Sequence, residues 1–306
     1  MVVRHLNCAT FCPVGQALIN GHGSPLKRGK LVVHCQLIES DDGLILVDTG
    51  LGTRDVARPM SALPGRLWQA LNQAKLDVAE TAVAQLRKLG YDPADVRHIV
   101  LTHLDFDHAG GLADFPRAQV HAFELEYLGA MARPLRRDRM RYAPAQFAHG
   151  VDWRLYDTRG DKWFGFDSVR AIPGVDPEVL LVPLLGHSRG HCGVAINTGK
   201  DWLFNVGDAA FHHGELDAPR RNCPLGLRAY QNVFQYDRQA RLFNQRRLRD
   251  LALSPHANVR IVCSHDSAMM VGFAGHGPVP ALAGVTAHPH PGAVAFRGAT
   301  PTPTGT

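Results

Sequence analysis

A group of His and Asp side chains directly after an apolar run is the feature of this chain that most constrains its fold. Residues 98–102 (HIVLT) have the apolar, β-branched character of a buried strand. The residues after this run that can bind a metal are His103, Asp105, Asp107 and His108. Imidazole and carboxylate groups are the usual ligands of zinc and other divalent first-row ions. The segment therefore predicts a metal site at the end of a strand.

Three more ligand-type residues occur downstream in similar positions. His187 lies in the turn GHSRGH, Asp208 follows the apolar run 202–206, and His265 follows the run 260–263. Polar residues of this kind also form hydrogen-bonded loops, and a histidine can satisfy polar groups in a core. The recurrence of the pattern at several strand ends favours the metal site over these alternatives.

The combined pattern resembles the metallo-β-lactamase fold superfamily of metal-dependent hydrolases, whose motifs are HxHxDH, a GH-containing turn, a GD after a strand and a late His. The resemblance covers roughly residues 30–270. Within the superfamily the layout is most similar to the N-acyl-homoserine lactonases. The segments that carry this likeness are residues 29–31, 45–50, 89–91, 106–111 and 207–209.

The resemblance implies an α/β fold, an αββα sandwich of two mixed β-sheets flanked by helices. We expect one hydrolase domain over residues 1–285 and a flexible tail, rich in Gly, Pro and Thr, over residues 286–306. The turn residues 40–43 predict a hairpin between the runs 31–38 and 44–48. The other expected strands are residues 98–102, 119–123, 180–184, 194–196, 202–206 and 260–263, and the clearest expected helices are residues 81–89 and 237–251.

The resemblance also implies roles for individual residues. The first metal would be held by His103, Asp105 and His187, the second by Asp107, His108 and His265, and Asp208 would bridge the two. The implied cofactors are two divalent metal ions, with zinc expected. Asp107 and Asp208 are the expected catalytic residues, Asp107 as the proton shuttle.

Several neighbouring residues have expected supporting roles. His191, the second His of the GHSRGH turn, is expected to form structural hydrogen bonds and not to bind metal. Asp48 and Asp266 are candidates for hydrogen bonds to ligand histidines, although Asp48 is equally consistent with a turn cap. His212 and His213 lie near the site in sequence and have no role in the family pattern.

Two residues depart from the family pattern. Asp105 stands where the family usually has His, so the ligand set contains a third carboxylate. Ligand counting for two divalent ions then gives a neutral centre instead of about one positive charge, which predicts a weaker Lewis acid and makes manganese or iron competitive with zinc. Phe211 stands where the lactonases have a Tyr that is thought to polarise the lactone carbonyl.

The implied activity is hydrolysis by a metal-bound hydroxide, with a small-molecule lactone or carboxylic ester as substrate. Alternatives on the same fold are a β-lactam, thioester or phosphoester hydrolase, or a ligand-binding protein that turns its ligand over poorly. The segment 131–141 contains five Arg and is expected to be mainly a solvated helix face, so we leave it out of the predicted site.

Composition restricts the remaining classes. The chain has 306 residues, a formal net charge of +5 and a pI near 9.0, a balance too weak to predict nucleic-acid binding. It shows no secretory signal pattern and no apolar stretch long enough to span a bilayer, so we expect a cytoplasmic protein without a membrane partner. The six scattered Cys predict reduced thiols. The oligomeric state stays open, with a homodimer among the alternatives.

Overall fold

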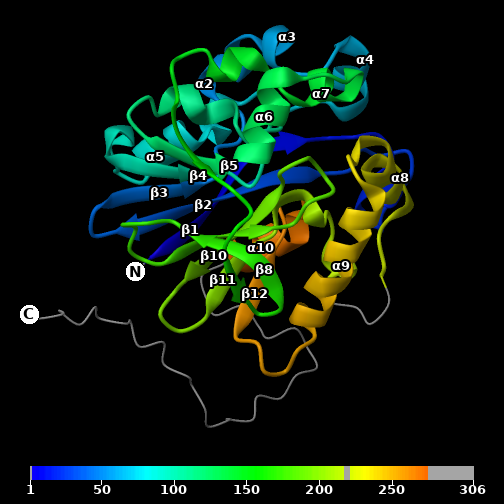
Figure 1. Cartoon of the computed structure of the whole chain (residues 1–306). Coiled ribbons are helices and arrows are strands. Elements are labelled where there is room, and N and C mark those ends of the chain that lie inside the picture. Colours follow the sequence, from blue (N-terminus) through cyan, green and yellow to red (C-terminus); the bar gives the residue numbers. More distant parts are fainter. Residues whose placement is uncertain (1, 217–220, 275–306) are drawn as a thin grey trace, which may run out of the picture.

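Two six-stranded β-sheets lie face to face, with helices on their outer sides (Figure 1). The computed structural model describes residues 2–216 and 221–274. The first sheet has the strand order β1-β2-β3-β4-β5-β6 and the second the order β12-β11-β10-β9-β8-β7. The αββα sandwich expected from the sequence is confirmed. The predicted tail over residues 286–306 lies outside the described residues.

The first sheet combines an antiparallel and a parallel half. Its strands are β1 (Val3–Phe11), β2 (Leu31–Ser40), β3 (Gly43–Val47), β4 (Val96–Val100), β5 (Gln119–Phe123) and β6 (Asp152–Tyr156). The β2–β3 hairpin is confirmed, and β3 to β6 run parallel to one another. The sequence did not predict β1 or β6. Both lie at sheet edges and mix polar and apolar residues, so neither shows the continuous apolar run of a central strand.

The second sheet is antiparallel except at one edge. Its strands are β7 (Asp161–Trp163), β8 (Phe166–Ala171), β9 (Val179–Pro183), β10 (Cys192–Asn197), β11 (Trp202–Asn205) and β12 (Val259–Val262). The edge strand β12 pairs in parallel with β11. The chain therefore leaves β11 and β12 at the same end of this sheet, as it leaves β3 and β4 at one end of the first sheet.

The central strands bury both of their faces, which explains their apolar runs. In β3, Ile45 and Val47 point into the core between the sheets, where they join Leu181 and Val194 of the second sheet. Leu44 and Leu46 belong to the outer core beneath the helices. Alternate side chains of a strand face opposite sides, so a strand covered on both sides needs apolar residues at every position.

Helices flank the sheets, most of them on the outer faces (Figure 1), whereas the helix over residues 267–274 packs against β1 and β2 at the core between the sheets. They are α1 (Gln16–Asn20), α2 (Thr53–Ala57), α3 (Pro59–Ala62), α4 (Arg66–Asn72), α5 (Ala82–Lys88), α6 (Glu124–Ala132), α7 (Arg136–Arg141), α8 (Leu225–Phe234), α9 (Arg238–Ala252) and α10 (Ser267–Ala274). The predicted helices are confirmed as α5, capped by the side chain of Thr81, and α9, capped by Asp237. Within the described part of the chain, no helix has both the length and the apolar character needed to cross a membrane.

Candidate metal centre

Four buried side chains from distant parts of the chain form the first of two clusters. Asp105 Oδ2 lies 3.4 Å from His103 Nε2 and 3.2 Å from His187 Nε2. Asp208 Oδ2 lies 3.7 Å from His103 Nε2 and 3.3 Å from His187 Nε2. His103 and Asp105 follow β4, His187 lies in the turn between β9 and β10, and Asp208 follows β11.

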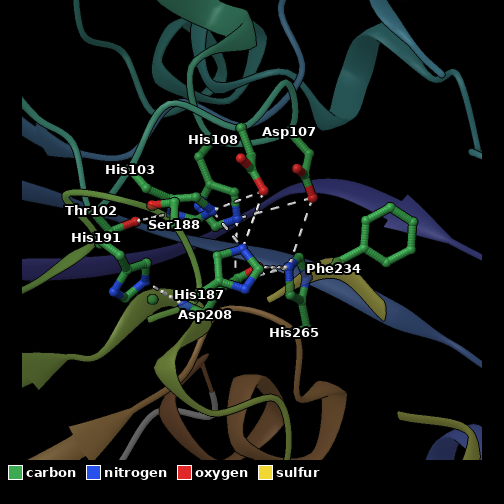
Figure 2. Close-up of polar contacts among 12 residues, drawn as sticks. Thr102, His103, Asp107, His108, His187, Ser188, His191, Asp208, Phe234 and His265 are labelled. Carbon is green, nitrogen blue, oxygen red and sulfur yellow. Dashed lines mark hydrogen bonds and ion pairs between the residues drawn. The ribbon is translucent and has the colours of Figure 1, made fainter. Parts of the chain in front are cut away.

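The second cluster lies on the other side of Asp208. His108 Nε2 is 3.4 Å and His265 Nε2 is 3.0 Å from Asp208 Oδ1, the oxygen that does not face the first cluster. Asp107 Oδ2 lies 4.0 Å from His108 Nε2 and 3.7 Å from His265 Nε2. In Figure 2, His103, Asp107 and His108 approach from one side and His187, Asp208 and His265 from the other. The structure thus brings together all seven residues singled out in the sequence.

The spacing and hydrogen bonding of these atoms suit metal ions. Tetrahedral coordination with bonds of about 2.0–2.2 Å separates ligand atoms by about 3.3–3.6 Å, close to most of the distances found here. His103 Nε2, His108 Nε2 and Asp208 Oδ1 are buried without a hydrogen-bond partner in the described residues. Buried polar atoms are normally satisfied, so three such atoms pointing at one region indicate a cation-binding site.

Asp48 orients one of the histidines. It follows β3 with a left-handed backbone (φ 56°), and its carboxylate accepts hydrogen bonds from Thr102 N and Thr102 Oγ1, both 2.8 Å, and from His108 Nδ1 at 2.9 Å. With Nδ1 as the donor, Nε2 of His108 keeps its lone pair for the cluster. The expected hydrogen bond between Asp48 and a histidine of the clusters is confirmed.

Asp266 does not play the corresponding role for His265, so that expectation is wrong. His265 donates from Nδ1 to the Val32 carbonyl at 2.7 Å. Asp266, the next residue, accepts from the backbone N of His213 at 2.6 Å and contacts its ring Nδ1 at 2.7 Å. Burial raises the pKa of Asp266, but the hydrogen bonds from His213 outweigh it and lower this pKa to about 2. Asp266 is next to His265 in the sequence, but its carboxylate is hydrogen-bonded to His213.

His191 and Gly207 fix the backbone at Asp208. The Asp208 N–H donates to His191 Nε2 at 2.9 Å, and His191 Nδ1 donates to the Leu184 carbonyl at 3.1 Å. The predicted structural role of His191 is confirmed. Gly207 has a φ of +52°, and a Cβ there would lie 2.8 Å from His191 Nε2, so the close approach requires glycine.

Glu126 of α6 connects two of the loops that contribute to the first cluster, a role that was not predicted from the sequence. Its Oε1 accepts from Leu104 N and its Oε2 accepts from Ser188 Oγ and Gly190 N. Leu104 lies between His103 and Asp105 of the first cluster, and Ser188 directly follows His187. One buried carboxylate therefore positions both loops.

Arg141, at the end of α7, is the main residue of the site that sequence reasoning missed. It is 4% exposed and forms a bidentate ion pair with Asp105, with Nε–Oδ1 at 2.8 Å and Nη2–Oδ2 at 2.7 Å. The solvated face expected for the Arg-rich segment holds for Arg136 and Arg139, which are exposed, and is wrong for Arg141. A buried carboxylate needs a positive charge beside it. The third carboxylate in the predicted ligand set, Asp105, was therefore a sign in the sequence that a cationic side chain would lie nearby.

The ion pair changes the electrostatics expected for Asp105. Burial raises the pKa of Asp105, but Arg141 and His103 outweigh burial and hold it well below its usual range. Asp105 is therefore ionised and its charge is offset by the guanidinium. Together the two residues are neutral, like the His that the family usually has there, so the extra carboxylate does not by itself make the centre neutral.

A small pocket of about 20 Å³, lined by both polar and apolar side chains, opens onto the two clusters. Its wall residues outside the clusters are Pro64, Trp68, Phe106, Met140, Arg141, Tyr230 and Phe234. Phe211 is buried and stacks on His265, with ring centroids 4.9 Å apart. Burial raises the pKa of Tyr230, and the nearby carboxylates of Asp107 and Asp105 raise it further. Tyr230 therefore keeps its hydroxyl proton in this pocket.

Comparison with known proteins gives matches over most of the chain. The family model described as the metallo-beta-lactamase superfamily matches residues 28–265. The Mycobacterium tuberculosis protein named "Probable metallo-hydrolase Rv2300c" is 41% identical over 264 residues, which cover 86% of this chain and 80% of the relative. The N-acyl homoserine lactonase of Bacillus cereus is 29% identical over 198 residues, covering 63% of this chain and 71% of the relative.

A solved structure shares the fold. The Bacillus thuringiensis lactonase mutant with N-decanoyl-L-homoserine bound at its active site superimposes with a TM-score of 0.64, covering 87% of this chain and 94% of that chain. The two sequences are 21% identical in this alignment, so this likeness supports the sandwich and its topology alone.

Proposed function

The chain belongs to the metallo-beta-lactamase superfamily and is a metal-dependent hydrolase, and we propose that it opens a lactone or cleaves a carboxylic ester at a two-metal centre. The observation that carries the proposal is the position of Asp208, whose two carboxylate oxygens face two separate clusters. In the proposed centre, His103, Asp105 and His187 would hold the first ion, and Asp107, His108 and His265 would hold the second. Asp208 would contribute to both.

The donor set consists of nitrogen and oxygen atoms. Such a set suits zinc, and the carboxylate of Asp105 also suits harder ions such as manganese or iron. Bound divalent ions would lower the pKa of a coordinated water and polarise the carbonyl oxygen of the substrate. The protein residues then have to orient the substrate and move protons.

Asp107 is the proposed proton shuttle. Its carboxylate is buried beside Asp208 and His265 and lines the pocket in which the substrate would react. A carboxylate that binds an ion through one oxygen keeps its second oxygen free to move a proton. It can therefore take a proton from the attacking water and return it to the leaving oxygen.

Tyr230 is the proposed hydrogen-bond donor to the developing oxyanion. The resemblance to the lactonases implies a Tyr at the position of Phe211. Phe211 has no hydroxyl and cannot donate this hydrogen bond. Tyr230 comes from α8, lines the same pocket, and lies next to Phe211 with ring centroids 5.9 Å apart. A protonated phenol in this place can supply the interaction that Phe211 cannot.

The pocket walls support a substrate with an apolar arm. Trp68, Phe106 and Phe234 offer aromatic surface beside the clusters, which suits an apolar group attached to the ester carbonyl; the pocket holds about 20 Å³, so a longer acyl chain would extend beyond it. The named Bacillus relatives are N-acyl homoserine lactonases. We therefore propose a lactone that carries an acyl chain, with an N-acyl homoserine lactone as the first compound to test.

The test is proton release at constant pH after addition of a long-chain N-acyl homoserine lactone. The protein is assayed as isolated, after chelation and after return of zinc, manganese or iron. Asp208→Ala removes the bridge, and Asp161→Ala is a matched change of an exposed carboxylate in β7. Acid release that requires both metal and Asp208 supports the proposal.

Two other results would overturn the lactone assignment. Release of acid or thiol only from a β-lactam, thioester or phosphoester panel would identify another substrate class for the same centre. Saturable lactone binding with product formation no faster than background, after reconstitution with each metal, would indicate a binding protein.

A further inference from the structure

We infer that Arg141 makes the two metal positions unequal, because its guanidinium competes with an ion for Asp105 and His187. The first position (His103, Asp105, His187 and Asp208) would then bind its ion more weakly than the second (Asp107, His108, His265 and Asp208). The inference rests on the proposed two-metal centre and is independent of the substrate.

The hydrogen-bonding capacity of Arg141 is used completely. Its Nε donates to Asp105 Oδ1, and Nη2 donates to Asp105 Oδ2 and contacts His187 Nε2. Its Nη1 donates to the carbonyls of His187 and Phe234. A guanidinium has five N–H groups, and each one has a partner here. Two of these partners, Asp105 Oδ2 and His187 Nε2, are atoms that the first ion would need.

Arg141 is also held in place. The carbonyls of His187 and Phe234 anchor one end of its guanidinium, and the side chain is buried at the end of α7. Moving it away would leave Asp105 as an unpaired charge in a buried site, which is unfavourable. The competition is therefore a property of the folded chain and is not removed by rotation of an exposed side chain.

The second position has no such competitor among the described residues. His108 uses Nδ1 for Asp48 and His265 uses Nδ1 for the Val32 carbonyl, so the Nε2 atom of each ring faces the cluster. His108 Nε2 makes no hydrogen bond. An ion that enters here meets oriented ligands and, among the described residues, no guanidinium bound to them.

An ion at the first position meets two unfavourable effects. It must take the lone pair of His187 Nε2 from contact with Arg141, and it must share Asp105 Oδ2 with a positive charge that also repels it. Changes to groups that contact metal ligands typically alter metal affinity by about 10- to 100-fold. We expect the dissociation constants of the two positions to differ by at least that factor.

The experiment is a titration of the chelated full-length protein with cobalt(II). Visible absorption follows the coordination of each ion, and metal analysis after gel filtration counts the ions bound per chain. His103→Ala should remove the weaker step and His265→Ala the tighter step, which identifies the positions. The test variant is Arg141→Met. Arg137→Met is the matched control, because Arg137 lies one turn earlier in α7 and contacts Gln235 and Tyr236 but no proposed ligand.

We expect the unmodified protein to bind cobalt in two separate steps with different dissociation constants. In Arg141→Met the larger dissociation constant should fall, so that the ratio of the two constants is reduced about 10- to 100-fold. Arg137→Met should leave both constants unchanged. If Arg141→Met does not fold, Asp105→His combined with Arg141→Met removes both buried charges and should fill in two nearly equal steps. Equal filling of the unmodified protein, or an unchanged or larger gap in a folded variant without Arg141, would overturn the inference. Failure to bind any ion would instead overturn the proposed metal centre itself.

Discussion

His108 Nδ1 donates a 2.9 Å hydrogen bond to Asp48 Oδ2, which links the end of β3 to a proposed ligand that follows β4. The parallel pairing of β3 and β4 makes this contact, because both strands end at the same side of the sheet. The left-handed backbone of Asp48 turns its carboxylate toward Thr102 and His108.

Replacing this carboxylate should weaken metal binding without unfolding the protein. In Asp48→Asn the new residue tolerates a left-handed backbone and its amide oxygen can still accept from Thr102 N. The amide N–H groups cannot accept from His108, so the orientation and tautomer of the ring are no longer fixed. We expect metal affinity to fall by about 10- to 100-fold, measured by competition with a chromophoric chelator. Asp266→Asn, which contacts His213, is the control; an equal loss in both variants would contradict the prediction.

Gly207→Ala should be more destabilising than the same change at another left-handed glycine. Both Gly207 (φ +52°) and Gly199 (φ +82°) have a left-handed backbone, but a Cβ at Gly207 meets His191 and Thr102 within 3 Å, whereas a Cβ at Gly199 meets nothing within 4 Å. We expect a loss of about 1 kcal/mol for Gly199→Ala from backbone strain and about 3 kcal/mol for Gly207→Ala after overpacking is added. Urea denaturation of the chelated proteins measures both, and similar losses would argue against the overpacking.

Asp55 of α2 should make the protein less stable as the pH rises from about 4 to 6. Burial raises its pKa to about 6, although Gly52 N–H and Gln146 donate hydrogen bonds to it. A raised pKa means that the folded state binds this proton more tightly than the unfolded chain. The contribution of Asp55 to the free energy of unfolding is therefore largest below about pH 4. It declines between about pH 4, where Asp55 ionises in the unfolded chain, and about pH 6, where it ionises in the folded protein, and it is constant above that.

The change Asp55→Asn should remove this decline, because the amide is uncharged and its oxygen can still accept a hydrogen bond. Between pH 4 and pH 7 the variant should gain up to about 3 kcal/mol relative to the unmodified protein. Both proteins should be unfolded in urea in the presence of chelator, so that metal release does not contribute. If the two proteins lose the same free energy of unfolding over this interval, the raised pKa of Asp55 is disproved.

Tyr230→Phe should lower kcat for lactone opening by about 100-fold, as for loss of one oxyanion donor, and leave KM nearly unchanged. The Phe ring preserves the packing against Phe211 and Phe234, so the fold should be retained. Tyr236→Phe removes a hydroxyl that accepts from Arg189 outside the pocket and serves as the control. Full activity of Tyr230→Phe would leave the hydroxyl without a catalytic role.

The sequence predicted most of the inner strands and the grouping of the seven ligand-type residues for one physical reason, whereas the inner strand β8, which mixes buried and exposed residues, was not predicted. Strands buried on both faces are apolar throughout, and a polar residue directly after such a strand is conspicuous. The edge strands β1 and β6 lack this contrast, and neither was predicted. Arg141 was missed for a related reason, because an Arg that pairs with a distant buried carboxylate looks in the sequence like its solvated neighbours on α7.

Asp48 and Asp266 show a second limit of sequence reasoning. Each lies just after a buried strand and each was a candidate to support a ligand histidine. Asp48 reaches His108, whereas Asp266 turns to His213. The direction of a side chain in a turn depends on backbone angles, such as the left-handed φ of Asp48, that the residue type does not specify.

The proposed ligands come from both sheets, with His103 to His108 following a strand of the first and His187, Asp208 and His265 supplied by the second. Ions bound between them would act as a reversible cross-link between the two halves of the sandwich. Removing the ions would loosen this connection, so amide hydrogen exchange in the segments around the centre should be faster in the chelated protein than in the metal-bound protein.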